Sequence, residues 1–218
     1  MGICRTNILG RTVTFEHPDP RFIDEIILKL CYTPNSSFEI KTNDIVIDAG
    51  ANVGVFTVLA ALKASHGKVL AIEPERTNFD FLEDNLKANG LTNVILVNAA
   101  LSNKTAEAEL SLGNPGEGTI MPTSSNRRRQ KCSTLSIGNL MKTYQIDHVN
   151  FFKIDIEGAE FLLFENPSWL AAVDTVVIEI HQSFGDENKI EQALLNAKYR
   201  VSTVPAYDEG CIYLYATR

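Results

Sequence analysis

The sharpest chemical motif in the sequence is DAGANVG at residues 48–54, which lies where a predicted strand, 44–49, meets a predicted helix, 53–64. Ligands of open α/β sheets bind at the carboxyl ends of the strands, so the motif stands where a ligand is expected. Gly50 permits a tight turn and close ligand approach, and Gly54 lets the helix start near the sheet. The carboxylate of Asp48 suits a ligand with positive charge, whereas a pyrophosphate prefers bare backbone amides.

Phosphate-loop fingerprints fail at this motif. Asn52 stands where the second glycine of GxGxxG is required, and the sequence has no GxxxxGK[ST] string. Glu73 follows the next predicted strand, 68–72, about 20 residues past the glycines, where such folds place an acid that binds ribose hydroxyls. Taken singly, Glu73 could be an exposed turn residue. Its combination with Asp48 and the glycines favours a ligand site.

A second group of polar residues ends two later strands. Asp155 and Glu157 follow the predicted strand 150–154, and Glu179 and His181 end the strand 175–180. Residues two apart point to one side of a strand, so each pair shares a side. His181 is the natural base for a hydroxyl proton at neutral pH.

Each of these residues also has a simpler interpretation. His181 could be a hydrogen-bonded structural residue, and Glu157 could cap the following helix, because carboxylates favour helix N-termini. Asp155, Glu157 and His181 could bind a divalent metal, but nothing in the sequence fixes their geometry. We expect a metal-free site.

The elements that position these residues follow from the hydrophobic pattern. From residue 44, short apolar runs alternate with helix-period segments, which predicts βαβ units and a mainly parallel sheet. The last two apolar runs, 199–204 and 211–216, are joined too closely for a crossover and should pair antiparallel. Further strands are predicted at 94–97 and 106–112, and further helices at 79–89, 137–144, 159–165 and 190–197.

The chain divides into two predicted parts. Residues 1–40 should form an N-terminal extension that packs on the domain formed by residues 41–218. A segment rich in Gly, Pro, Ser and Asn, 113–129, is predicted to be a loop that covers or borders an acceptor pocket, because loops of this length are usually functional or disordered.

Four stretches resemble the FkbM family of S-adenosylmethionine-dependent methyltransferases: 44–54, 71–74 with the helix 79–89, 98–102, and KIDIEGAE at 153–160. With the strand and helix that follow, they cover roughly residues 40–200. The resemblance implies a class I methyltransferase fold: a Rossmann-like, doubly wound α/β domain with a mainly parallel seven-stranded sheet and an antiparallel C-terminal hairpin. It also implies S-adenosyl-L-methionine as cofactor, and O-methylation of a hydroxyl on a small molecule, sugar or secondary metabolite.

The resemblance also implies cofactor contacts. The cofactor-binding residues would be Asp48, Gly50, Ala51, Asn52 and Gly54 around the methionine end, Glu73 and Pro74 at the ribose, Asn98, Ala99 and Ala100 at the adenine, and Asp155. One departure is the lack of an acid after the third strand, where the chain has Asn98 and Ser102. We therefore expect backbone groups to recognise the adenine. His181 would act as base, with Asp155 and Glu157 orienting the hydroxyl or the cofactor's ammonium group.

Net charge, cysteine spacing and the length of the apolar runs limit the classes of acceptor and the cellular compartment that we expect. The net charge of −7 disfavours nucleic acid, and the basic run Arg127–Lys131 is interpreted as a solvated loop tip, with an anionic substrate as the alternative. Four scattered cysteines without a CxxC spacing suit the cytoplasm, and the apolar runs are too short for a membrane span. The sequence indicates no oligomeric state.

Two other functions remain open at this stage. One is a nucleic-acid or protein methyltransferase. The base-amino type places Pro-Pro-aromatic after an Asn or Asp at the fourth strand, where this chain has Ile156-Glu157-Gly158. The other is a cofactor-binding module without catalysis, because an intact cofactor motif does not establish turnover.

Overall fold

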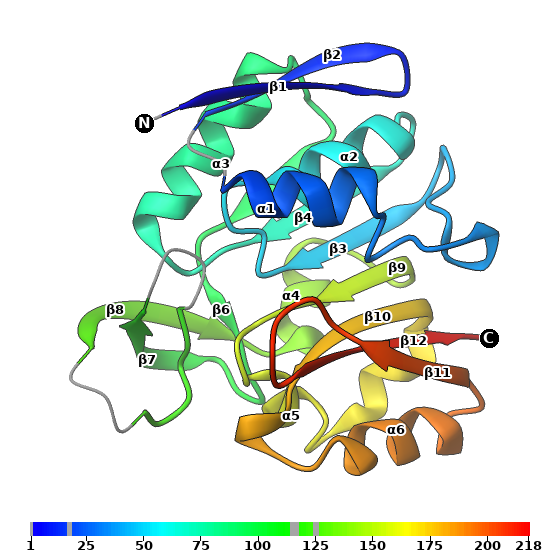
Figure 1. Cartoon of the computed structure of the whole chain (residues 1–218). Coiled ribbons are helices and arrows are strands. Elements are labelled where there is room, and N and C mark those ends of the chain that lie inside the picture. The colour runs from blue at the N-terminus through cyan, green and yellow to red at the C-terminus, as the bar shows by residue number, and fades with distance from the viewer. Residues whose placement is uncertain (1, 17–18, 114–117, 124–126) are drawn as a thin grey trace.

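A seven-stranded sheet forms the centre of the computed structural model, which describes residues 2–16, 19–113, 118–123 and 127–218 (Figure 1). Its strand order is β11-β12-β10-β9-β3-β4-β5, with every neighbouring pair parallel except the two that involve β12. The predicted fold class and the antiparallel C-terminal hairpin are therefore confirmed. The strands are β3 (Ile45–Ala49), β4 (Lys68–Ile72), β5 (Val94–Val97), β9 (Val149–Ile154), β10 (Val173–His181), β11 (Arg200–Pro205) and β12 (Cys211–Thr217).

Helices cover both faces of this sheet. Because neighbouring strand residues point to opposite faces, Val46 packs into the core under α2 and α3, and Ile47 packs into the core under α4, α5 and α6. Both strand faces are buried, as a doubly wound sheet requires. The helices are α2 (Val55–Lys63), α3 (Arg76–Ala88), α4 (Ile137–Thr143), α5 (Glu160–Leu163) and α6 (Glu187–Asn196), with 3-10 turns η3 (Pro167–Ala172) and η4 (Gln182–Phe184). Among the described residues, no helix has the length and apolar character needed to cross a membrane.

The N-terminal segment lies against α2 and α3. It contains the hairpin β1 (Ile3–Ile8) and β2 (Arg11–Glu16), then α1 (Pro20–Ile23), the π-helical η1 (Asp24–Leu28) and the 3-10 turn η2 (Ser36–Phe38). Figure 1 shows the hairpin across the upper end of α3. The side-chain amide of Asn89 accepts from the Thr14 N–H at 3.0 Å and donates to the Thr14 carbonyl at 2.7 Å, and Asn85 accepts from the Glu16 N–H at 2.6 Å. The side-chain amides of Asn85 in α3 and of Asn89 at its C-cap therefore take the hydrogen-bonding place of a neighbouring strand.

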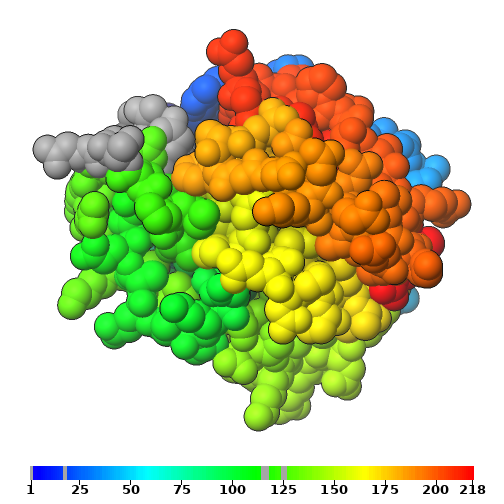
Figure 2. Space-filling model, turned by 90° about the horizontal axis from the view of Figure 1, so that it is seen from below, coloured from blue at the N-terminus to red at the C-terminus, as the bar shows by residue number. Residues whose placement is uncertain are grey.

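A second, three-stranded sheet was only partly expected. It has the order β6-β8-β7, from β6 (Ala100–Leu101), β7 (Ala106–Leu112) and β8 (Arg128–Leu135). In Figure 2 its green surface lies beside the yellow surface around α5. The predicted loop 113–129 is wrong at its end, because β8 already begins at Arg128. The arginines at the start of β8 do not form the apolar pattern that predicts a strand. In the structure, one of them, Arg129, forms a cross-strand ion pair with Glu109 of β7 at 2.8 Å.

Candidate active site

The turn from β3 to α2 is tightly constrained. Gly50, Asn52 and Gly54 all have positive φ, at 76°, 51° and 92°. A Cβ atom on Gly50 would lie 1.6 Å from the carbonyl oxygen of Asp155, so only glycine fits where the ends of β3 and β9 meet. A Cβ on Gly54 would lie 2.5 Å from the Leu82 side chain, so this glycine allows α2 and α3 to pack closely.

A narrow cleft opens at the ends of β3 and β4. Glu73 lines this cleft, and its two carboxylate oxygens accept hydrogen bonds from the backbone N–H groups of Asn52 and Glu75, both at 2.8 Å. Burial raises the pKa of Glu73 to about 7, and these two hydrogen bonds offset only part of that effect. The remaining walls combine polar residues with an apolar group made up of Ile72, Ala99, Ala100, Leu101, Leu110, Ile120 and Ile156.

Most of the predicted cofactor residues gather at this cleft. Those that line it are Gly50, Asn52, Glu73, Pro74, Ala99, Ala100 and Asp155, while Ala51 lines the neighbouring cavity. Asn98 is instead a support, because its side-chain amide donates to the Glu73 carbonyl at 2.8 Å. Gly54 serves the helix start, as described above. Sequence reasoning missed the wall residues Leu110 and Ile120, which come from β7 and from the segment before β8.

A wide cavity of about 780 Å³ lies on the other side of Gly50. It shares Gly50, Asn52, Asp155 and Glu157 with the narrow cleft. Its walls come from the N-terminal segment, the ends of β3, β9 and β10, and the turn between β11 and β12. The ionisable groups around it are Arg21, Glu25, Tyr32, Arg127, Lys153, Asp155, Glu157, Glu179, His181, Asp208, Glu209 and Cys211.

The segment predicted to border the acceptor pocket touches both spaces. Thr119 and Arg127 line the wide cavity, and Gly118 and Ile120 line the narrow cleft. The hydroxyl of Thr119 donates to the Glu157 carbonyl at 2.5 Å. Residues 114–117 and 124–126 of this segment lie outside the described residues.

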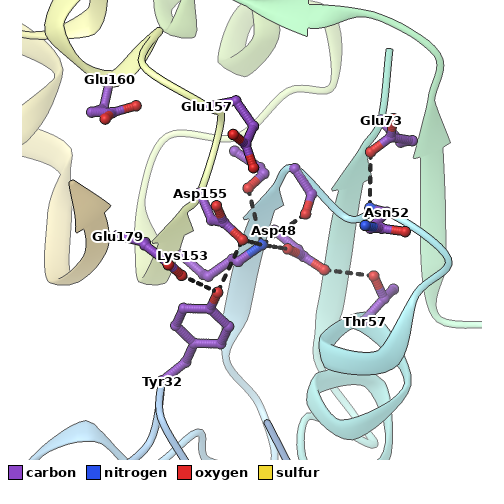
Figure 3. A network of polar contacts seen from close by, with 12 residues as sticks. Tyr32, Asp48, Asn52, Thr57, Glu73, Lys153, Asp155, Glu157, Glu160 and Glu179 are labelled. Atoms are coloured by element: carbon purple, nitrogen blue, oxygen red, sulfur yellow. Dashed lines mark hydrogen bonds and ion pairs between the residues drawn. The ribbon is translucent and has the colours of Figure 1, made fainter. Parts of the chain in front are cut away.

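Asp48 lies beneath the turn, in a buried ion pair (Figure 3). Its Oδ2 accepts from the Thr57 hydroxyl at 2.6 Å, and its Oδ1 lies 3.3 Å from Nζ of Lys153. Asp48 is fully buried and is not among the residues that line either described space. The expected direct contact between its carboxylate and a charged ligand is therefore replaced by a supporting role.

Lys153 links that pair to the cavity. Its ammonium group donates to the Gly50 carbonyl at 2.7 Å and lies 3.4 Å from Oδ2 of Asp155. Burial lowers the pKa of Lys153, but the charges of Asp48 and Asp155 more than compensate, so the pKa is raised overall. Lys153 therefore stays cationic, and its ammonium group holds the Gly50 carbonyl in the turn between β3 and α2.

His181 is enclosed by two glutamates. Its Nε2 lies 3.4 Å from Glu157 Oε2, and its Nδ1 lies 3.2 Å from Glu160 Oε1. Burial alone would lower the pKa of His181, but the two carboxylates raise it to about 12. A cationic imidazole with a carboxylate at each nitrogen cannot take up a further proton. The geometry therefore argues against His181 as the base.

Glu157 occupies the junction of the two spaces. Its φ of 54° is rare for a residue with a side chain, and such strain is concentrated at functional sites. Burial raises the pKa of Glu157, and the charge of His181 offsets part of that rise. The helix-capping alternative does not hold, because the N-cap of α5 is Ala159 and no side chain caps that helix.

Three important residues of this site were missed from sequence. Glu160 is fully buried and accepts the backbone N–H of both Gly158 and His181, at 2.9 and 2.8 Å. Lys153 could have been found, because a charge inside an apolar strand must be paired. Tyr32, far away in the chain, gave no local signal.

Two overlapping groups of possible metal donors lie close together among the described residues. The donor atoms of Asp155, Glu157 and His181 lie within 4.8 Å of one another, as do those of Glu179, His181 and Cys211. In the described structure, Asp155 contacts Lys153 and Glu157 contacts His181. The prediction of a metal-free site therefore stays a prediction.

Comparisons with known proteins agree with this arrangement. Residues 48–201 match the family model of the methyltransferase FkbM domain. A methyltransferase of Sordaria araneosa, sdnD, is 26% identical over 209 residues, with 80% of this chain and 79% of that protein covered.

Two solved structures share the fold. The precorrin-6y C5,15-methyltransferase of Geobacter metallireducens superimposes with a TM-score of 0.53 at 13% identity, covering 84% of each chain. A Streptococcus mutans protein crystallised with S-adenosylhomocysteine gives a TM-score of 0.51 at 13% identity, covering 88% of this chain and 97% of that one. The chain therefore belongs to the FkbM methyltransferase family, has the class I methyltransferase fold, and uses S-adenosyl-L-methionine as its cofactor.

Proposed function

We propose that the protein methylates a hydroxyl group of a small molecule, sugar or secondary metabolite, without a metal ion. The observation that supports this proposal most strongly is that the narrow cleft and the wide cavity meet. A cleft whose lining suits the adenosine of the cofactor and a cavity of about 780 Å³ meet at Asp155 and Glu157.

The narrow cleft fits S-adenosyl-L-methionine in its donor set. Apolar walls beyond Glu73 suit an adenine ring, and a buried carboxylate suits the paired hydroxyls of a ribose. Glu73, Pro74, Ala99 and Ala100 would hold the adenosine, and Gly50 and Asn52 would border the methionine end. When bound, the cofactor supplies an electrophilic methyl group on a sulfonium.

We propose that the carboxylate of Glu157 is the general base that takes the proton from the acceptor hydroxyl. The residue lines both spaces, and its raised pKa lies closer to neutrality, where a general base is most effective. His181 would keep Glu157 oriented through the 3.4 Å contact. Most of the acceleration would come from holding the acceptor oxygen in a near-attack position.

The charge of the wide cavity favours a neutral or cationic acceptor over a phosphorylated one. Six carboxyl groups line it: Glu25, Asp155, Glu157, Glu179, Asp208 and Glu209. Its four cationic residues are Arg21, Arg127, Lys153 and His181; Lys153 and His181 are engaged by carboxylates, and Arg21 pairs with Asp19 at 2.7 Å. The same excess of negative charge disfavours nucleic acid, and the scattered cysteines suit a cytoplasmic enzyme.

A mass-spectrometric screen tests this function. The protein with S-adenosyl-L-methionine is incubated with panels of hydroxylated metabolites, glycans, amines, RNA and peptides. A mass gain of one methyl group on a hydroxyl of a small acceptor is expected. Methylation of RNA or peptide alone would replace the proposal. Cofactor binding with no turnover on any panel would favour a non-catalytic module.

A further inference from the structure

The hydroxyl of Tyr32 reaches the floor of the wide cavity from the N-terminal segment. The ring is buried against Phe56 and Tyr213, with edge contacts at centroid distances of 5.4 and 5.8 Å. Lys153 Nζ lies 5.1 Å from the ring centroid. These contacts leave the ring little freedom, so the position of its hydroxyl is well defined.

That hydroxyl contacts two carboxyl groups equally. It lies 3.0 Å from Asp155 Oδ2 and 3.0 Å from Glu179 Oε2 (Figure 3). A phenol has one proton to donate, and an ionised carboxylate can only accept. Both contacts can be full two-centre hydrogen bonds only if one of the two carboxyl groups carries a proton and donates it to the phenol oxygen; otherwise the two carboxylates must divide one phenol proton between them.

The proton belongs on Glu179. Asp155 has the ammonium group of Lys153 at 3.4 Å and a side chain that is 25% exposed, and both features stabilise its charged form. Glu179 is only 7% exposed. Burial raises the pKa of Glu179 to about 8, with the charge of Asp155 acting in the same direction.

We infer that Glu179 is protonated and donates to the Tyr32 hydroxyl, which in turn donates to Asp155, and that Tyr32 is thereby a positioning residue of the methyl-transfer site. This hydrogen-bond chain holds the side chain of Asp155, which lines both spaces. The N-terminal segment is thus part of the active site. This inference rests on the proposed function for its catalytic consequence, but the protonation of Glu179 stands without it.

The groups that face Glu179 come from every element around it. They are Cys31 and Tyr32 from the N-terminal segment, Lys153 and Asp155 at the end of β9, His181 on β10, and Cys211, Tyr213 and the more distant Tyr215 on β12. Of these, Lys153 and His181 remain cationic and the buried Tyr32 and Tyr213 remain neutral, because their pKa values are all raised. Glu179 is therefore the group expected to change charge near pH 8.

Infrared spectroscopy tests the protonation of Glu179 without any acceptor. The C=O stretch of neutral carboxylic acids should contain, besides a Glu73 component with a midpoint of about 7, a component that vanishes as the pH is raised through about 8. The component with the midpoint of about 8 should be missing in Glu179→Gln and should titrate at a different midpoint in Tyr32→Phe. A spectrum of Glu179→Gln identical to the wild type would overturn the inference, as would a wild-type midpoint in Tyr32→Phe. If Tyr32→Phe fails to fold, the infrared titration of Glu179→Gln tests the inference by itself.

Tyr215→Phe is the matched control. Tyr215 is also a buried tyrosine, on β12, but its hydroxyl donates to the carbonyl of Cys31 in the N-terminal segment at 2.6 Å rather than to a site carboxylate. Its band and midpoint should equal those of the wild type. An equal shift in Tyr215→Phe and Tyr32→Phe would show a general packing effect and refute the specific role.

Kinetics with an acceptor from the screen test the positioning role. Tyr32→Phe should lower kcat on the order of 10- to 100-fold with little change in KM for the cofactor, because a misplaced group costs rate rather than binding. The loss of wild-type turnover above about pH 8 should disappear in Glu179→Gln. Unchanged kcat and an unchanged pH profile in both variants would remove the positioning role. An intact infrared result with no methyl transfer to any hydroxyl would instead remove only the proposed function.

Discussion

The narrow cleft and the wide cavity meet at Gly50 but are built in opposite ways. The cleft is formed mainly by the segments that follow the consecutive strands β3, β4 and β5, with further walls from β7 and from the segment after β9, and it contains one buried acid, Glu73. The cavity is formed by segments far apart in the chain, and its charges largely pair with one another, as in Lys153 with Asp155. The cofactor half is a local motif, whereas the acceptor half is a long-range ion-pair network.

If this division is right, acceptor-side changes should act on turnover. Glu157→Gln should lower kcat by about 100- to 10,000-fold, the usual range for a lost general base, with nearly unchanged affinity for S-adenosylhomocysteine. Steady-state kinetics and calorimetry measure the two quantities separately. Full turnover in Glu157→Gln together with a large loss of turnover in His181→Gln would show that His181 is the general base instead.

The junction itself should tolerate no side chain. Gly50→Ala places a Cβ 1.6 Å from the Asp155 carbonyl at a φ of 76°, so the ends of β3 and β9 must separate. We expect a loss of roughly 4 kcal/mol or more in the free energy of unfolding, measured by urea denaturation. Gly138→Ala is the control. A Cβ there has nothing within 4 Å and lies in a helix, so a gain of about 0.5 to 1 kcal/mol is expected. Equal effects of the two changes would refute the close contact.

The same division explains what could be predicted from sequence. The glycine motif and Glu73 were readable because each follows its own strand, and periodicity located the seven strands of the main sheet. Tyr32 was not readable, because its partners Asp155 and Glu179 lie more than a hundred residues away. His181 was assigned as base from its ordinary pKa, and only the fold reveals Glu157 and Glu160 on either side of it.

Cofactor-side changes should act on binding instead. Glu73→Ala removes hydrogen bonds to a charged acceptor and should weaken S-adenosylhomocysteine binding by about 1.5 to 3 kcal/mol. Isothermal titration calorimetry gives the affinity. Asp80→Ala is a suitable control, because this α3 acid is exposed in a pair with Arg76 and lies away from both spaces. Comparable losses in the two variants would contradict a direct role for Glu73.

The smallest expected effect is the pH dependence of cofactor binding through Glu73. Ribose hydroxyls donate to its ionised form, and its pKa is about 7. Affinity for S-adenosylhomocysteine should therefore fall as the pH drops below about 7, approaching a limit of about tenfold per pH unit.

Stability of the unliganded protein should change in the opposite direction. The pKa of Glu73 is raised from 4.5 to about 7 on folding, so the folded chain holds a proton that the unfolded chain has lost between these values. This contribution to the free energy of unfolding is complete below about pH 4.5 and is lost as the pH rises through 7. Glu73→Gln should flatten both curves, as measured by calorimetric titrations and melting temperatures from about pH 5 to pH 8. A wild-type affinity independent of pH, or the wild-type slope in Glu73→Gln, would exclude Glu73 as the titrating group, because Lys153 and His181 keep their charge throughout this range.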